Sequence, residues 1–120
     1  MRGLSFAVVA GNLGRDPEVR SLKSGQIMAN LVVAVSRKDK EGDDKVDWIT
    51  IRCFGKTAET CQKYLSKGDS VLVVGRVCSR SVEDNGYTKN VIEIIGSRVH
   101  FINTKKRIER VEEEETEPPF

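Results

Sequence analysis

Two aromatic rings in the stretch VDWITIRCF (46–54) are the side chains best suited to binding chemistry. Side chains alternate faces along a strand, so Trp48, Arg52 and Phe54 fall on one side and two isoleucines on the other. If the isoleucines face a core, the rings stand about 20 Å apart on the outer surface. Exposed rings stack on bases of any sequence, each worth about 1–3 kcal/mol, and an arginine neutralises phosphate. The pattern therefore predicts a surface for single-stranded nucleic acid.

The opposite orientation of this strand is the alternative. It would bury Trp48 and Phe54 in the core and leave the isoleucines facing solvent or a subunit partner. Arg52 favours the first orientation, because a core face would not carry an arginine without a partner.

A second stretch, SVLVVGRVCSRSV (70–82), places more cations beside the first. A row of valines with Gly75 on one face leaves Arg76 and Arg80 on the other. Each charge taken singly is an ordinary solvated side chain, but their number beside the rings predicts a basic groove. The cations assigned to this groove from charge and strand alternation are Arg37, Lys38, Arg52, Lys56, Arg76, Arg80 and Lys89.

Short stretches rich in valine and isoleucine, separated by turn residues, predict a mostly β protein. The five predicted strands cover residues 5–12, 27–36, 46–54, 70–82 and 88–102. An apolar face at helical spacing predicts one helix over 56–68, which Gly68 would end. Turns are predicted at Asp16-Pro17, Ser24-Gly25 and Asn85-Gly86, and an exposed loop over the charged run 37–45.

Five strands with one helix between the third and fourth is the order of the OB-fold, a five-stranded Greek-key barrel. Gly11, Gly75 and Gly96 lie inside strand patterns, where a small barrel needs kinks or bulges. Another small β-barrel or a sandwich is the alternative. The pattern predicts an all-β domain over 1–103 and a flexible, charged, acidic tail over 104–120.

Charge is distributed unevenly along the 120 residues. Residues 1–110 hold 20 Lys and Arg against 13 Asp and Glu, whereas residues 111–120 hold five Glu and no base. A basic body predicts an anionic partner, and the acidic end is attracted to the same surface.

Other sites are disfavoured by residue spacing. Cys53, Cys61 and Cys78 lack metal-ligand spacing and are expected to be free buried thiols, so no metal or cofactor is expected. His100 stands alone, without paired carboxylates or a phosphate loop, which disfavours a nuclease or hydrolase and leaves no catalytic residue. Neither a membrane helix nor a secretion signal is expected. The Gly11-x-x-Gly14 spacing resembles the KH-domain loop, but the surrounding strands predict a simple bend.

Several segments together resemble the bacterial single-stranded DNA-binding protein (SSB) family. They are GNLGRDPEVR, ANLVVAVS, DWITIRCFGKTAE, YLSKGDSVLVVGRV and the terminal EPPF, spanning about residues 5–102 and the extreme C-terminus. The resemblance implies an OB barrel assembled as a homotetramer that coats single-stranded DNA in replication, recombination and repair. It also implies a cytoplasmic, nucleoid-associated protein without enzymatic activity. In the family pattern Trp48 and Phe54 stack bases, while Lys56, Lys67 and Arg80 contact the DNA backbone.

The chain departs from the family pattern at two aromatic positions. Many members carry a tryptophan after the second strand, where this chain has SRKDK, and another where it has Val82. We therefore expect weaker binding per site and a steeper dependence on salt.

The acidic C-terminal end resembles the segment through which the family recruits replication and repair proteins. The residues implied in partner binding are Glu117, Pro118, Pro119 and Phe120. A plain solubilising tail is the alternative, and a tail on so short a linker could also lie on the basic groove and compete with DNA. A primosome-type OB-fold adapter, acting mainly through protein contacts, is the alternative function.

Overall fold

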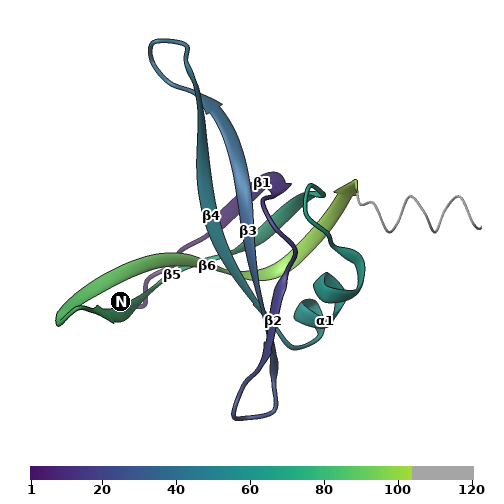
Figure 1. Ribbon diagram of the computed structural model, residues 1–120. Helices are drawn as coiled ribbons and strands as arrows, with labels where there is room; N and C mark the ends of the chain where they lie inside the picture. The colour runs from purple at the N-terminus through teal and green to yellow at the C-terminus, as the bar shows by residue number, and fades with distance from the viewer. Residues whose placement is uncertain (104–120) are drawn as a thin grey trace, which may run out of the picture.

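The computed structural model describes residues 1–103, a mostly β structure with one helix (Figure 1). Its elements in chain order are β1 (Ala7–Leu13), β2 (Glu18–Ser21), β3 (Ile27–Lys38), β4 (Asp44–Phe54), α1 (Gly55–Tyr64), β5 (Ser70–Asp84) and β6 (Tyr87–Asn103). The helix therefore follows β4 and precedes β5, the third and fourth of the five strands predicted from sequence.

The strands form one sheet in the order β1-β5-β6-β4-β3-β2. Residues Asn12 and Leu13 of β1 also pair with Ala34 and Val33 of β3, which closes five strands into a ring. The pair β4–β6 is parallel, and the other neighbours are antiparallel. A closed ring of five strands with one helix is consistent with the predicted OB-fold.

Two of the strand glycines lie where the ladder changes register. Gly75 pairs with Gly96, beside a register shift between β5 and β6. A Cβ on Gly96 would approach side chains of Ile51, Cys53 and Val73 to about 3 Å. Gly11 lies where β1 comes close to the backbone of Ala34 on β3. The close backbone of a neighbouring strand thus accounts for glycine at positions 11 and 75, and close core side chains account for Gly96.

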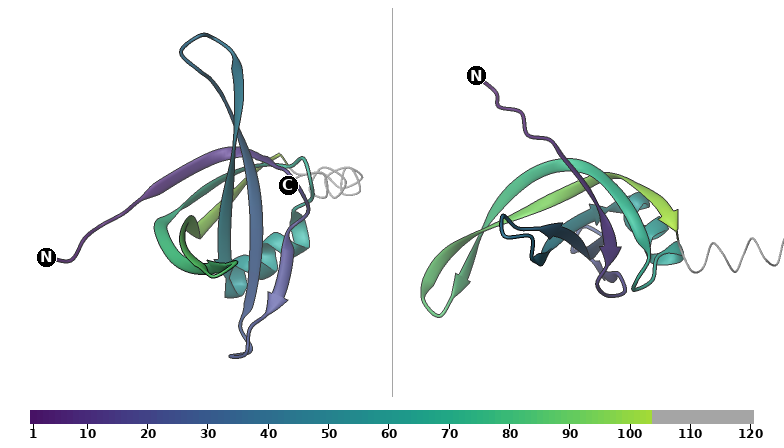
Figure 2. Two further views of the ribbon diagram at one scale, coloured as in Figure 1. Left: turned by 60° about the vertical axis from the view of Figure 1, so that its left-hand side comes forward. Right: turned by 90° about the horizontal axis from the view of Figure 1, so that it is seen from above.

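The core fills the ring and is covered at one end by α1 (Figure 1). Its largest fully buried side chains are Leu31, Val33, Ile51, Cys53, Cys61, Leu65, Val71 and Val73. The predicted valine row of β5 leaves this core after Gly75, because Val77 is exposed where the β5–β6 ribbon extends past the barrel. Figure 2 shows this ribbon projecting away from the barrel.

The predicted helix 56–68 is too long, since α1 ends at Tyr64 and Leu65 is extended. The residues after it form a turn that is bonded to the end of β1. Ser66 N–H donates to the Asp69 carboxylate at 2.8 Å, and Gly68 N–H donates to the Leu13 carbonyl at 2.8 Å. These bonds stabilise a turn in place of another helical turn, with Gly68 at a φ of +92°.

Two segments expected as loops contain strand residues. β2 lies between the predicted turns and pairs antiparallel with β3 through Glu18↔Asn30 to Ser21↔Ile27. The charged run 37–45 is a loop only at its centre, because β3 continues to Lys38 and β4 begins at Asp44. Lys38 lies opposite Asp44 and pairs with it, and Arg37 pairs diagonally with Asp47, so ion pairs across these strand ends favour the ladder. The hairpin turn at Asn85-Gly86 is confirmed by positive φ at both residues.

All three cysteines are free, as expected, but Cys78 is only half-buried. The hydrogen bond between the Cys61 and Cys53 thiols, together with burial, raises the pKa of the Cys61 thiol. Within residues 1–103 no cluster of His, Cys, Asp and Glu has the makings of a metal site. The same part of the chain contains no helix with the length and apolarity needed to cross a bilayer.

Candidate nucleic-acid interface

The second half of β4 presents its aromatic side chains away from the core. Trp48 is 63% exposed and Phe54 is half-buried, while Ile51 and Cys53 between them are fully buried. The predicted orientation is therefore confirmed, and the alternative with both rings in the core is wrong.

The indole of Trp48 rests against the backbone at the end of β1. A Cβ on Gly14 would lie 2.5 Å from Cζ3 of that ring, so the indole occupies the space above the glycine. Gly14 N–H donates to the Val32 carbonyl of β3 at 2.8 Å, which fixes the backbone beneath the ring. One part of the indole is thus supported by protein and the remainder faces solvent.

Arg52 connects the aromatic row to a buried carboxylate. Its Cζ lies 5.6 Å from the centroid of the Phe54 ring, within the range of a cation–π contact. Its Nη1 also donates to Oε1 of Glu93 at 3.1 Å, and Nε of Arg80 forms an ion pair with the same oxygen at 3.1 Å. The Glu93 side chain is only 3% exposed, so two guanidiniums balance one buried charge.

Strand register brings three predicted arginines onto one outer face. Arg52 of β4 is level with Ile95 of β6, and Arg76 of β5 lies opposite the same Ile95. Arg80 lies two pairs beyond Cys78↔Glu93 on the same side of the β5–β6 ladder. Together with Trp48 and Phe54 these residues define what we call the barrel face.

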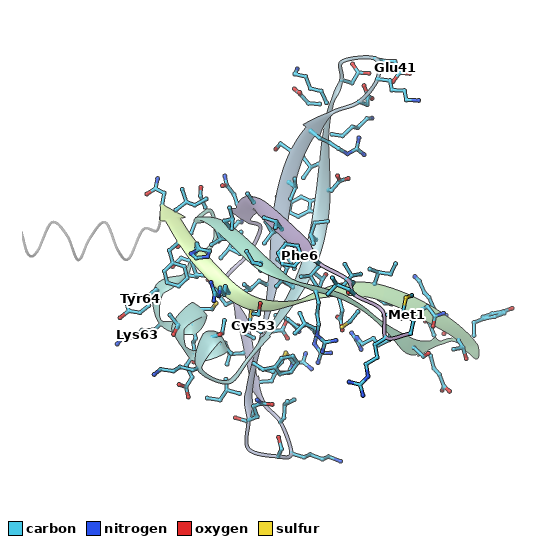
Figure 3. All side chains as sticks on the ribbon, turned by 180° about the vertical axis from the view of Figure 1, so that it is seen from behind. Met1, Phe6, Glu41, Cys53, Lys63 and Tyr64 are labelled. Atoms are coloured by element: carbon cyan, nitrogen blue, oxygen red, sulfur yellow. The ribbon has the colours of Figure 1, made fainter. Side chains whose placement is uncertain are left out.

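Arg37 and Lys38 do not belong to the barrel face. Both lie in the outer part of the β3–β4 hairpin, whose tip carries Glu41 far from Cys53 in the barrel (Figure 3). Arg37 Nε donates to Asp47 at 2.8 Å, a contact that raises the pKa of the guanidinium, and Lys38 Nζ lies 3.2 Å from Asp44. Residues 37–47 hold four basic and five acidic side chains, so this hairpin is not a basic arm.

Comparison with known proteins agrees with this geometry. Residues 5–102 match the family model of the single-strand binding protein family. The chain belongs to this family. It is similar to "Single-stranded DNA-binding protein 1" of Chlorobaculum tepidum, with 37% identity over 110 residues that cover 87% of this chain and 68% of that protein. The resemblance stated from sequence is therefore confirmed.

The two lysines assigned by the family pattern, Lys56 and Lys67, lie on α1 and in the turn after it, not on the strands of the barrel face. Lys56 is exposed in the first turn of α1, two residues after Phe54, at a cavity of about 300 Å³ between the helix and β6. Lys67 is exposed in the turn after α1, and its backbone N–H donates to the Asp16 carboxylate at 2.7 Å. Asp16 thus joins two segments that carry the family resemblance, and the bend predicted for GNLGRDPEVR is confirmed.

Sequence reasoning missed three residues of this region. Glu93 and Tyr87 were given no role, although Tyr87 is 77% exposed, and Gly14 was assigned only to a bend. Tyr87 lies on the same side of the β5–β6 ladder as Arg80, because Asp84↔Tyr87 and Arg80↔Val91 are separated by an even number of pairs. Extending the alternation of 88–102 by one residue would have found it. The four predicted partner-binding residues, Glu117, Pro118, Pro119 and Phe120, lie outside the described residues.

Proposed function

We propose that this member of the family binds and coats single-stranded DNA without sequence preference through its barrel face. The main support for the proposal is the exposed indole of Trp48 on a strand whose inward-facing Ile51 and Cys53 are fully buried. Family membership and the name of the Chlorobaculum tepidum relative support it.

In the proposed complex, bases stack on Trp48 and Phe54, which stand about 20 Å apart along β4. Arg76, Arg80 and Lys56 neutralise phosphates around these rings, while Arg52 supports Phe54 from its Glu93 contact. Stacking on π faces needs no base-specific hydrogen bond, which makes binding tolerant of sequence.

Tyr87 offers a third ring farther along the β5–β6 ribbon. Its exposure and its side of the ladder would let a strand leaving Arg80 stack on it. Such a ring would compensate in part for the tryptophan that Val82 replaces.

We propose that the protein assembles as a homotetramer. Residues 7–11 of β1 pair with β5, but pairing with β3 begins only at Asn12, so one edge of this segment is unpaired among the described strands. Phe6 and Val8 are exposed beside it. An apolar, unpaired edge is a template for pairing with a second copy.

The wider role that we propose is genome maintenance in the cytoplasm, without enzymatic activity. DNA coating would accompany replication, recombination and repair. Residues 117–120 would recruit partner proteins, with Phe120 filling an apolar pocket and the acidic residues attracting a basic surface.

The proposal is tested by titrating the full chain with fluorescein-labelled dT oligomers and with duplex DNA of equal length. We expect tight binding of the single strand, weak binding of the duplex, and a tetramer by light scattering. Failure to bind the dT oligomer, with partner proteins still bound, would instead favour the adapter alternative.

A further inference from the structure

Gly14 belongs to the GNLGRDPEVR segment that carries the family resemblance. Its backbone conformation is one that other residues can also adopt. The residues with positive φ in the described chain include five glycines, at 25, 42, 55, 68 and 86, but not Gly14. An alanine could therefore adopt the same backbone without strain. The reason for a glycine at this position must be space.

The space above Gly14 is filled by Trp48. A Cβ there would lie 2.5 Å from Cζ3, 3.2 Å from Cε3 and 3.6 Å from Cη2, three atoms of the six-membered ring. No other side chain is among the three nearest atoms, so the contact is specific to the indole.

The backbone beneath the ring is held from two directions. Gly14 N–H donates to Val32 of β3, and Leu13 exchanges hydrogen bonds with the turn after α1, through Asp69 and Gly68, each at 2.8 Å. Because β3 and the turn after α1 both belong to the closed barrel, the backbone of Leu13 and Gly14 beside the indole is fixed relative to β4.

We propose that Gly14 is a positioning residue that holds the Trp48 indole in the orientation in which it stacks on a base. This inference rests on the proposed function. A ring already fixed in its bound orientation loses less rotamer freedom on binding than a ring that must be ordered. The three distances place such a Cβ close to the plane of the ring, at its Cζ3 edge, so Gly14 leaves both faces of the indole free of its own contact.

The test compares Gly14→Ala with Gly3→Ala, a matched control because a Cβ at Gly3 meets nothing within 4 Å. Trp48 is the only tryptophan, so time-resolved fluorescence anisotropy of the free protein reports on this ring alone. We expect a larger amplitude of fast indole motion in Gly14→Ala and none of this change in Gly3→Ala. Unchanged anisotropy in Gly14→Ala would overturn the proposal, whether or not the protein binds DNA.

DNA binding supplies the second measurement, with a labelled dT oligomer. We expect Gly14→Ala to raise Kd about 2- to 12-fold, the range for one side chain that must be ordered on binding. In a Trp48→Ala background the same change should alter Kd less than about 2-fold, because no ring remains to be positioned. An equal loss in both backgrounds would assign Gly14 to the loop itself and contradict the proposal.

A folding control completes the design. If Gly14→Ala alone fails to fold, the double variant with Trp48→Phe should restore folding, because the smaller ring frees the space. A double variant that also fails would show that the backbone needs glycine and would overturn the proposal.

Discussion

The two halves of β4 belong to one strand but differ in how their charged side chains are paired. In the outer half, Lys45 and Asp47 lie among exposed charges of the β3–β4 hairpin that pair with one another. In the inner half, Trp48 is open to solvent and Arg52 is tied to a buried carboxylate. A high density of basic residues therefore does not by itself make a DNA-binding surface. The internal partners of those residues decide how much charge is presented.

The two kinds of ion pair also differ in strength. An exposed pair such as Arg37–Asp47 contributes about 0–1 kcal/mol and is readily exchanged. The Glu93 carboxylate is buried, so leaving it without Arg52 or Arg80 would be more costly. We therefore expect the hairpin to be adaptable and the barrel face to be preorganised.

The largest expected effect is the loss of an exposed ring from the inner half. Trp48→Ala should weaken binding of a dT oligomer by about 1–3 kcal/mol, a 5- to 150-fold rise in Kd, because one stacked base is lost. Val46→Ala removes an exposed apolar side chain from the outer half of the same strand and should change Kd less than about 2-fold. Equal effects at the two positions would abolish the distinction.

The two counter-ions provide the second contrast, measured by urea unfolding without DNA. Glu93→Gln should lower the free energy of unfolding by about 1–2 kcal/mol, because two guanidiniums lose a buried carboxylate. Asp47→Asn should lower it by less than about 1 kcal/mol, since its pair with Arg37 is exposed. A larger loss in Asp47→Asn would reverse the assignment of which pair is structural.

Salt dependence separates free from paired cations. Within residues 1–103 Arg76 forms no ion pair, so Arg76→Gln should reduce the slope of log K against log salt by about 0.7, one phosphate contact. Arg37→Gln should reduce it by less than half as much. A wild-type slope near zero would contradict phosphate neutralisation altogether.

The smallest effect is expected from the acidic C-terminal residues. In the β3–β4 hairpin, acidic side chains form ion pairs with nearby cations. If the acidic C-terminal residues compete with DNA for the cations of the barrel face in the same way, deletion of 111–120 tightens DNA binding at low salt. The gain should vanish near 1 M salt, where the Debye length is about 3 Å. An unchanged Kd at low salt would mean that these residues do not compete with DNA.

Much of this architecture could be predicted from alternation and turn residues. The orientation of Trp48 followed from Ile51 and Arg52 on opposite faces, and the hairpin turn followed from Asn85-Gly86. Strand ends were harder, because charged side chains at Lys38 and Asp44 support a ladder as readily as a loop when they pair across it.

Contacts between distant segments could not be predicted. Glu93 is forty-one residues from Arg52 in the sequence. No residue near Glu93 in the sequence indicates that it is the shared counter-ion of Arg52 and Arg80. The same holds for Gly14, whose need for space comes from a ring on another strand. Pairing of this kind depends on the register of the closed ring, which a single sequence does not reveal.

The most direct test is fluorescence of Trp48 during titration with a dT oligomer, with binding followed in parallel by the anisotropy of a label on the oligomer. We expect strong quenching of the indole that reaches its limit at the same stoichiometry as binding, because a base stacks on the exposed ring. Saturated binding with unchanged tryptophan emission would show that DNA follows another path and would contradict base stacking on Trp48.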